Sequence, residues 1–274
     1  MKLLFSEQKS DYGSYQFPYA VWAVPEAGEK PSDIFRAGFL PSSRQLDRFY
    51  LCRQIRVNLA KFDLSSENRR ILRKGKGINV ALVPREKYRY TPERRDFFKT
   101  YADIKFGKDV MTCERLDALF AAPIISHLLV VTDAQSGAEI GVATLYVEGA
   151  ALAYYYYAFY DLNYYARNLG MFMMTSAVDL FAGRGVKNLY LGTCYSASAL
   201  YKTQFAGAEF FNGFRWSDNL AELKFLLRRD QKTAADRHLL ETEEYRDQFY
   251  AGDLGKIAAA SAFSVKLKAS LTGD

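Results

Sequence analysis

The segment 152–211 constrains the fold of this chain more than any other. Residues 152–160 read LAYYYYAFY, and such an unbroken run of aromatic and small apolar side chains is typical of a strand buried on both faces. Apolar residues recur at helical spacing over 169–181, and 189–195 is the next apolar run. A strand, a helix and a second strand of these lengths form a right-handed parallel unit in one sheet. Backbone N–H groups at the start of such a helix can bind an anion or an oxyanion.

The elements predicted around this unit place it in a mixed sheet. Ile124–Thr132 and Ala138–Val147 are predicted strands that precede residues 152–160, so an antiparallel meander leads into a helix and a parallel strand. Thr91 is predicted to cap one helix, and Ser217 or Asp218 another. Further strands are predicted within 45–63, 79–84 and 210–216, and helices at 92–103, 112–121, 219–229 and 230–250. The Ala-rich end, 256–270, is expected to dock on the body or on another subunit.

Composition excludes a disordered chain and predicts a cytoplasmic one. Of 274 residues, 49% are apolar, yet no uninterrupted apolar run reaches the roughly 18–20 residues of a membrane helix. The apolar start of the chain is too short for the core of a signal peptide. Cys52, Cys113 and Cys194 are widely spaced, as expected for reduced thiols, and no zinc-ligand spacing is present. We therefore predict no metal site and interpret His127 and His238 as structural.

Positive charge gathers in one segment. From Arg36 to Lys76 there are eleven Lys or Arg residues against Asp47, Asp63 and Glu67, whereas the whole chain has a net charge of +6. Clustered cations raise the local concentration of phosphate groups and give salt-dependent nucleic-acid binding. A solvated basic surface explains the same pattern. The segment therefore predicts either an RNA contact or an ordinary basic face.

Motifs at the turns of the strand, helix and strand unit suggest two families. Arg167-x-x-Gly170 resembles the acyl-CoA binding turn of Gcn5-related N-acetyltransferases, but Phe172 stands where that family has a small residue. A bulky side chain there is expected to obstruct a pyrophosphate, which disfavours coenzyme A. The segments FYD (159–161), Leu169-Gly170, YLG (190–192) and Tyr201-Lys202 with Phe205 are instead similar to the C-terminal half of arginyl-tRNA–protein transferases.

A second block near the N-terminus resembles the same transferases. It runs Arg36-Ala-Gly-Phe39, Ser43, Tyr50-Leu-Cys52, Arg56-Val57, Phe62 and Ser65-Ser-Glu-Asn68-Arg69-Arg70, in the order and spacing of that family's N-terminal pattern. Cys52 matches the second cysteine of a Cys-x-x-Cys pair, but Phe49 replaces the first. A metal or cluster site is therefore not expected. Together the two blocks cover about two-fifths of the chain.

The resemblance implies a fold, a domain plan and an activity. The fold is α/β (α+β), an acetyltransferase-like (GNAT) mixed sheet flanked by helices with a basic N-terminal subdomain packed on it. We predict a basic tRNA-contacting region at 1–110, a transferase core at 111–230 and a helical extension at 231–274. The implied enzyme moves an amino acid, arginine or similar, from tRNA onto the amino group of a protein N-terminus, a peptide or a small acceptor. Aminoacyl-tRNA is then a co-substrate, and no cofactor is required.

Attack of an amine on an aminoacyl ester defines what the site must contain. The free amine has a pKa of about 8, so positioning, an oxyanion site and a proton donor for the leaving ribose oxygen suffice. The predicted catalytic residues are Asp161, Tyr195 and Tyr201. Those predicted to bind substrate are Tyr157, Tyr160, Asn163, Arg167, Gly170, Gly192, Thr193, Cys194 and Lys202. Those predicted to bind tRNA are Arg36, Arg44, Arg56, Arg69, Arg70, Arg73 and Lys74.

Simpler interpretations compete with several of these roles. Asp161, which opens a loop toward Asn163, is more typical of a turn, Lys202 fits an ordinary exposed helix lysine, and the tyrosines at 154–157 fit core packing. Two other functions fit the pattern: an acyl-CoA-dependent N-acetyltransferase of the same fold, and an RNA-binding module without catalysis. The sequence leaves the donated amino acid and the acceptor open.

Overall fold

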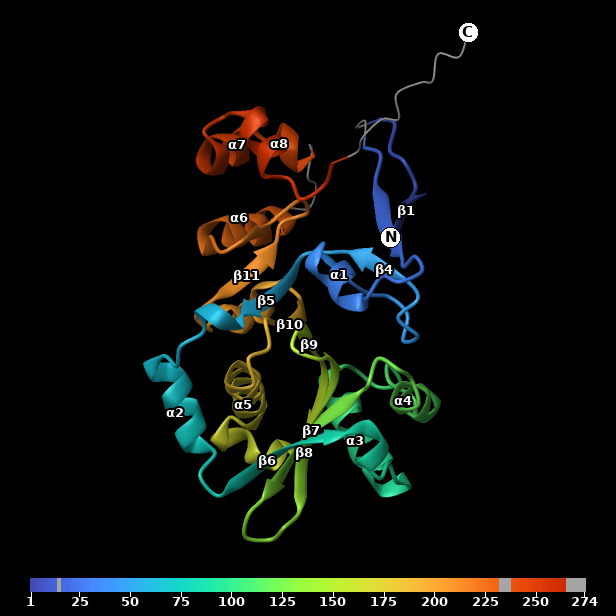
Figure 1. The fold of residues 1–274 in the computed structure, drawn as a ribbon, viewed down its shortest axis with the longest axis vertical. Coiled ribbons are helices and arrows are strands. Elements are labelled where there is room, and N and C mark those ends of the chain that lie inside the picture. The colour runs from blue at the N-terminus through green and yellow to red at the C-terminus, as the bar shows by residue number, and fades with distance from the viewer. Residues whose placement is uncertain (14–15, 232–237, 265–274) are drawn as a thin grey trace.

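The chain folds around an eight-stranded mixed sheet with a four-stranded sheet beside it (Figure 1). A computed structural model describes residues 1–13, 16–231 and 238–264. The large sheet has the order β12-β11-β5-β10-β9-β8-β7-β6, and the small one β1-β2-β4-β3. The strands of the large sheet are β5 (Gln54–Asn58), β6 (Ile78–Pro84), β7 (His127–Asp133), β8 (Glu139–Glu148), β9 (Leu152–Tyr160), β10 (Asn188–Thr193), β11 (Ala208–Phe211) and β12 (Trp216–Ser217). Those of the small sheet are β1 (Lys2–Glu7), β2 (Tyr19–Val24), β3 (Phe39–Pro41) and β4 (Phe49–Leu51).

The predicted strand, helix and strand unit is present. Strands β7, β8 and β9 form an antiparallel meander, α5 (Leu169–Gly183) follows, and β10 returns parallel to β9. The predicted fold class, a mixed sheet flanked by helices, is confirmed. Strand β5 pairs antiparallel with both β10 and β11, so sequence from before residue 110 continues the same sheet as the meander. The division into domains at residue 110 stays a prediction.

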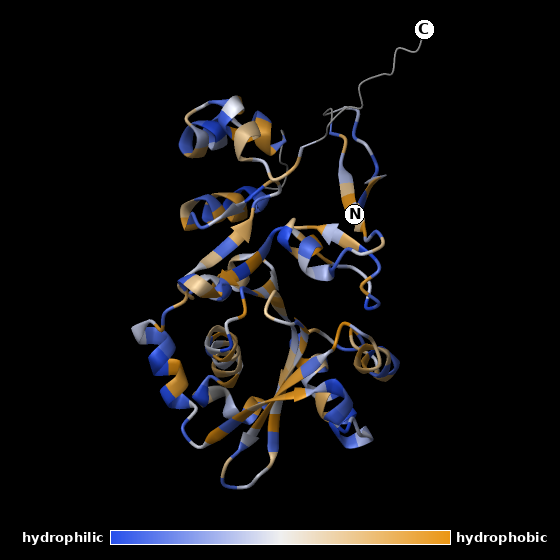
Figure 2. Ribbon diagram, in the orientation of Figure 1, coloured by the Kyte–Doolittle hydropathy of each residue, from blue (hydrophilic) through white to orange (hydrophobic). Residues whose placement is uncertain are grey.

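Helices cover both faces of the large sheet, because successive residues of a strand point to opposite sides. Ala153 and Tyr155 of β9 lie in one hydrophobic cluster with α5 and with α2 (Ser66–Lys74). Leu152 and Tyr154 lie in a second cluster with α1 (Pro31–Arg36), α3 (Pro92–Lys105) and α4 (Cys113–Phe120). Figure 1 shows α5 and α3 on opposite sides of β7–β9, and Figure 2 shows hydrophobic residues concentrated on these strands. The prediction of a strand buried on both faces is thus confirmed.

Side chains cap the starts of three helices, and the cap at Thr91 is the one that the sequence predicted. Ser65, Thr91 and Thr112 each accept a hydrogen bond from the backbone N–H three residues later, which satisfies a donor that has no partner within the helix. The cap of α6 (Leu220–Asp230) was placed wrongly, because Asn219, and not Ser217 or Asp218, accepts from the first-turn amides. Ser217 is engaged elsewhere, since its hydroxyl donates to Glu222 at 2.7 Å.

The ends of the chain differ from the sequence expectations in detail. At the N-terminal end, β1 pairs antiparallel with β2, and α1 follows. The strand predicted at 210–216 is two strands, β11 and β12, joined by a turn at Asn212–Arg215. Short 3-10 segments occur at η1 (Leu59–Lys61), η2 (Arg85–Lys87), η3 (Leu162–Arg167), η4 (Ala197–Thr203) and η5 (Leu239–Glu241). Of the C-terminal predictions, α7 (Glu243–Tyr250) and α8 (Leu254–Ala260) are described, whereas 232–237 and 265–270 lie outside the described residues.

Candidate active site

Strands β9 and β10 separate halfway along their length. They pair only between Leu152–Tyr154 and Asn188–Tyr190. A register shift against β5 then occurs between Tyr190 and Gly192, and Gly192 has a φ of +83°, a left-handed conformation that glycine adopts readily. Because a bulge of this kind bends its strand, β10 turns toward β5 while β9 continues to Tyr160. A cavity of about 590 Å³ lies in the gap.

We call this space the tyrosine cavity. Its walls come from β9, from the start of α5, from β10 and η4, and from the end of α3. They are formed by Tyr101, Phe106, Tyr155, Tyr156, Tyr157, Ala158, Tyr160, Asn168, Leu169, Gly170, Met171, Met174, Leu191, Tyr201 and Lys202. The lining is aromatic and apolar except for a few hydroxyls, one amide and one ammonium, and it contains no carboxylate. This composition is typical of a small-molecule site with a few orienting polar groups.

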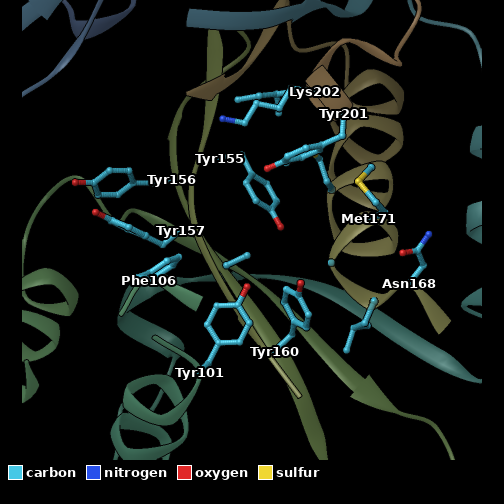
Figure 3. A pocket seen from close by; sticks show the side chains of 15 residues that line it. Tyr101, Phe106, Tyr155, Tyr156, Tyr157, Tyr160, Asn168, Met171, Tyr201 and Lys202 are labelled. Atoms are coloured by element: carbon cyan, nitrogen blue, oxygen red, sulfur yellow. The ribbon is translucent and has the colours of Figure 1, made fainter. Parts of the chain in front are cut away.

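Three tyrosine hydroxyls point toward one space in the tyrosine cavity. Figure 3 shows Tyr155 from above and Tyr101 and Tyr160 from below, with their oxygen atoms directed toward one another, while the Tyr201 ring from η4 lies higher in the view, beside Tyr155. The rings of Tyr101 and Tyr160 lie 4.7 Å apart between centroids, and Tyr101 stands on α3, more than fifty residues before β9. The cavity therefore presents several O–H donors at one place.

The hydroxyl of Tyr155 is buried and finds no hydrogen-bond partner among the described residues. Burial raises the pKa of Tyr155, so its oxygen keeps its proton and remains a donor at neutral pH. An unsatisfied buried polar group costs about 1–3 kcal/mol, which a fold tolerates most readily where a ligand supplies the partner. Tyr155 is thus the cavity residue best placed to donate to a substrate oxygen.

Lys202 supplies the positive charge at the upper wall of the cavity in Figure 3. Its Nζ donates to the carbonyl oxygen of Thr193 at 2.8 Å, and it makes no ion pair with a described residue. Burial lowers the pKa of the Lys202 ammonium, because desolvation penalises the charged form. A part-buried ammonium without an anionic partner is a natural site for a substrate carboxylate.

The N-terminus of α5 opens on the same space. Asn168 adopts a left-handed conformation just before the helix, and its side chain caps no amide. A Cβ atom at Gly170 would lie 2.7 Å from the hydroxyl oxygen of Tyr160, so only glycine lets the first turn approach that ring so closely. The backbone amides at this end have no partner within the helix and attract negative charge.

The structure brings five of the predicted site residues together and leaves the others outside. Tyr157, Tyr160, Gly170, Tyr201 and Lys202 line the cavity. Residues of the β10 end lie just beyond it: Gly192 is beside the Lys202 ammonium, Thr193 offers the carbonyl that Lys202 contacts, and Cys194 is fully buried. Burial raises the pKa of the Cys194 thiol, which does not favour a nucleophile.

Asp161 and Asn163 form a turn and do not line the cavity. The Oδ1 of Asp161 accepts the backbone N–H of Asn163 at 2.9 Å, which is the turn interpretation of this residue. Tyr195 is also engaged: its hydroxyl accepts the backbone N–H of Arg53 at 2.8 Å, and the Arg53 guanidinium lies over its ring at 5.1 Å. Neither Asp161 nor Tyr195 is therefore positioned to contact a ligand in the tyrosine cavity.

Arg167 and Phe172 both contact the C-terminal end of α2. The Arg167 guanidinium donates to the carbonyl oxygens of Lys74 and Lys76, and the ring of Phe172 is buried where a Cβ at Gly75 would lie only 1.9 Å away. Phe172 thus packs into the core and not across the first turn of α5. The sequence argument that its ring obstructs a pyrophosphate there was therefore wrong in its geometry.

The predicted tRNA-binding residues differ in their exposure and in their ion-pair partners. Arg56 is paired with Glu209 at 2.7 Å and lies 3.8 Å above the Trp216 ring, so it is engaged within the fold. Arg36 pairs with Asp33, and Arg70 pairs with Glu67. On α2, Arg69 and Arg73 are exposed and Lys74 is half-buried. Arg44 lies far from α2 in the sequence and lines a second cavity, next to α4.

Sequence reasoning missed several cavity residues. Tyr101 and Phe106 come from α3 and its end, Met171 and Met174 from α5, and Tyr155 from the tyrosine run. The run itself was a usable signal, since hydroxyl-bearing rings are unusual in a fully buried strand. Nothing in the sequence around Tyr101 distinguishes it from an ordinary core residue.

Metal and membrane features are absent from the part of the chain that the structure describes. No group of three His, Cys, Asp or Glu residues there could hold a metal ion. No described helix is long and apolar enough to cross a membrane. The three cysteines are free, and burial raises the pKa of the Cys52 thiol to about 12.

Comparison with known proteins gives one curated relative and partial structural overlaps. No protein-family model matches the chain. The aspartate/glutamate leucyltransferase of Ruegeria pomeroyi is 26% identical over 172 residues, 60% of this chain and 61% of that protein. L-PGS from Bacillus licheniformis overlaps 52% of this chain and 46% of its own, with a TM-score of 0.40 and 12% identity. A GCN5-related N-acetyltransferase from Sphaerobacter thermophilus overlaps 65% of this chain and 51% of its own, with a TM-score of 0.34 and 14% identity. The chain thus spans about three fifths of the length of the curated relative that it matches.

Proposed function

We propose that this chain is an aminoacyl-tRNA-dependent transferase that forms an amide between a donated amino acid and the amino group of an acceptor. The observation that carries the proposal is the tyrosine cavity, where O–H donors, helix amides and one ammonium converge at the divergence of β9 and β10. The order of the transferase-like motifs and the leucyltransferase relative support it.

The chemistry requires little beyond positioning. The acceptor nitrogen attacks the ester carbonyl carbon, the carbonyl oxygen becomes an oxyanion, and the bond to the ribose oxygen then breaks as the amine loses a proton. The Tyr155 hydroxyl can donate to the oxyanion, and the first turn of α5, whose amides have no partner within the helix, lines the same cavity. Tyr201, which is exposed and lines the cavity, can pass a proton to the leaving ribose oxygen.

The lining favours an apolar donated side chain over arginine. Met171, Met174 and Leu191 line the cavity together with the tyrosine rings, and no Asp or Glu among the described residues does. A buried guanidinium without a carboxylate would cost several kcal/mol, whereas a leucine-sized side chain gains about 1.5–3 kcal/mol on burial. We therefore propose leucine or a similar apolar amino acid as the donor, in agreement with the relative's leucyl specificity.

The acceptor in this proposal carries an acidic N-terminal residue. The ammonium of Lys202 has no anionic partner among the described residues and lies at the cavity wall, where it can pair with a carboxylate. The relative is an aspartate/glutamate leucyltransferase, which agrees with an acidic acceptor. The acceptor amine would then be held beside the donor ester by its own side chain.

Incubation with charged total tRNA tests this function directly. Each of several labelled amino acids is charged in turn, and peptides beginning with Asp, Glu, Asn or Lys serve as acceptors. We expect label from leucine on the Asp and Glu peptides. Acetylation from acetyl-CoA without tRNA would favour the acyl-CoA alternative, and tRNA binding without transfer would favour the RNA-binding module.

A further inference from the structure

A second cavity lies between the β3–β4 connection and α4. It has a volume of about 640 Å³, and its walls are basic and polar, with Arg44, Arg48, Arg115, Ser42 and Ser43 among them. We call it the arginine cavity. Two of its arginines come from the connection between short strands of the small sheet and the third from α4, so the fold assembles a cation cluster that no single sequence segment contains.

The three arginines are oriented by neutral acceptors. Arg44 donates to the carbonyl oxygen of Arg115 at 3.3 Å, Arg115 to that of Val110 at 2.9 Å, and Arg48 to the Ser42 hydroxyl at 3.2 Å. None of the three makes an ion pair with a described residue. Glu114 is the acidic residue in the lining, so three guanidinium groups face one carboxylate. A cluster fixed in place with surplus positive charge is prepared for an anion with several charges.

Aromatic rings connect this cavity to the candidate active site. Tyr156 and Tyr157 line both the arginine cavity and the tyrosine cavity, with 4.4 Å between their ring centroids. Figure 3 shows both rings extending from β9 on the side away from α5. Burial raises the pKa of Tyr156, and Arg115 and Arg44 lie close enough to oppose that rise. The cations and the rings therefore share one surface.

The divergence of β9 and β10 makes this connection possible. Met171 and Met174 of the tyrosine cavity belong to the α5 face of the sheet, whereas Tyr101 and Phe106 belong to the α3 and α4 face. The cavity thus passes through the gap between the two strands. The arginine cavity adjoins its α4 end, which leaves the η4 end, where Lys202 lies, for the acceptor.

We propose that the arginine cavity binds the 3′-terminal nucleotides of the donor tRNA, with phosphates on Arg44, Arg48 and Arg115 and bases against Tyr156 and Tyr157, and so delivers the aminoacyl ester into the tyrosine cavity. The proposal rests on the proposed function. Proteins bind single-stranded nucleic acid by combining cations along the phosphate backbone with aromatic rings on which the bases stack. An acidic N-terminal residue carries one side-chain carboxylate, for which the single ammonium of Lys202 is sufficient. The three arginines are therefore assigned to the tRNA and not to the acceptor.

The test compares tRNA with an intact 3′ end and the same tRNA trimmed of its 3′-terminal nucleotides. Binding of both is measured for the parent protein and for the triple variant Arg44→Gln, Arg48→Gln, Arg115→Gln at several salt concentrations. We expect the parent to bind intact tRNA roughly tenfold or more tightly than trimmed tRNA, and the variant to bind both as weakly as the parent binds the trimmed form. The salt slope for intact tRNA should fall by about 0.7 for each lost contact.

A matched variant, Lys87→Gln, Arg89→Gln, Lys187→Gln, removes three exposed cations that line neither cavity. This matched variant should still bind intact tRNA more tightly than trimmed tRNA. A preference lost only in the arginine-cavity variant would then reflect a local contact and not the change in net charge. The proposal is overturned if the arginine-cavity variant keeps that preference, or if it instead raises only the KM for an acidic acceptor peptide.

The outcome is independent of whether amino-acid transfer is observed. A protein that prefers the intact 3′ end through these arginines but transfers nothing would retain this site and refute the proposed function. A protein that transfers normally after the triple substitution, with unchanged affinity for intact tRNA, would retain the function and refute this site.

Discussion

At the scale of single residues, the Tyr155 hydroxyl gives the sharpest test of the candidate site. Replacing Tyr155 with Phe removes an oxygen that has no partner among the described residues. Stability should therefore be unchanged or rise by up to about 1 kcal/mol. The transfer rate should fall roughly a hundredfold, because an oxyanion donor is lost. Denaturation and single-turnover kinetics measure the two quantities.

Tyr88→Phe is the control for Tyr155→Phe. The Tyr88 hydroxyl donates to Glu139 at 2.7 Å and lies outside the tyrosine cavity. Its loss should lower stability by about 1 kcal/mol and leave transfer unchanged. If Tyr155→Phe also destabilised the fold and left the rate intact, Tyr155 would be a core residue only.

Lys202 predicts a pH dependence of acceptor choice. Burial lowers the pKa of its ammonium below the ordinary 10.5, so the charge is lost at a lower pH than for an exposed lysine. The preference for an Asp over an Asn acceptor, measured as the ratio of kcat/KM values, should therefore be full at neutral pH and decline as the pH rises through that pKa. The Lys202→Met variant, measured over the same pH range, separates the lysine titration from that of the acceptor amines.

Two substitutions of Lys202 test whether acceptor preference depends on the positive charge of this side chain or only on its size. Lys202→Arg keeps a positive charge, so the preference should persist to higher pH, whereas Lys202→Met should reduce it about tenfold at neutral pH and remove its dependence on the lysine titration. A ratio that does not respond to Lys202→Met would exclude this residue from acceptor recognition.

At the scale of elements, the contact between α2 and α5 depends on one glycine. Gly75 ends α2, and a Cβ atom there would lie 1.9 Å from the Phe172 ring. Gly75→Ala should therefore lower the free energy of unfolding by about 1–3 kcal/mol through overpacking. Gly183→Ala at the end of α5 has open space around it and an ordinary φ, so it should be neutral or slightly stabilising. Equal stability of the two variants in denaturant titrations would contradict the close contact.

The exposed face of α2 is expected to hold the tRNA backbone away from the 3′ end. Arg69 and Arg73 are exposed, whereas Arg70 is already paired with Glu67. Changing Arg69 and Arg73 to Ala should weaken binding of intact and trimmed tRNA alike and flatten the salt dependence, while Arg70→Ala should matter less. Filter binding at several salt concentrations measures this, and unchanged affinity in the double variant would show that α2 is a solvated surface.

At the scale of the whole molecule, one buried carboxylate connects the C-terminal helices to the sheet. Glu222 is fully buried and accepts hydrogen bonds from Asn212, Ser217, Tyr245 and Tyr250 at 2.7–3.1 Å. Glu222→Ala leaves these donors unsatisfied and should cost roughly 3 kcal/mol or more. Glu244→Ala, an exposed acid on α7, should change stability by less than about 0.5 kcal/mol. Urea unfolding compares the two, and similar midpoints would show that α7 does not depend on Glu222.

The local elements of this protein could be predicted from the sequence because their causes are local. An unbroken apolar run predicts β9 and apolar residues at helical spacing predict α5, and Ser65, Thr91 and Thr112 cap the helices that follow them through contacts three residues away. Even the order of meander, helix and parallel strand follows from short connections between neighbouring segments. Five of the predicted site residues line the cavity, and they lie in β9, at the start of α5 and in η4, which follows β10.

The site itself was decided by the tertiary structure. The bulge at Gly192 turns β10 toward β5 and leaves a gap between β9 and β10. Tyr101 of α3, Tyr155 of β9 and Tyr201 of η4 line the cavity in this gap. Other long-range contacts engage Arg56 with Glu209, through the pairing of β5 with β11, and bring Arg44 and Arg48 beside Arg115 without carboxylate partners among the described residues. Local sequence patterns record which residues are apolar or charged, but strand divergence and charge pairing depend on segments far apart in the chain, and these decided which side chains are available for chemistry.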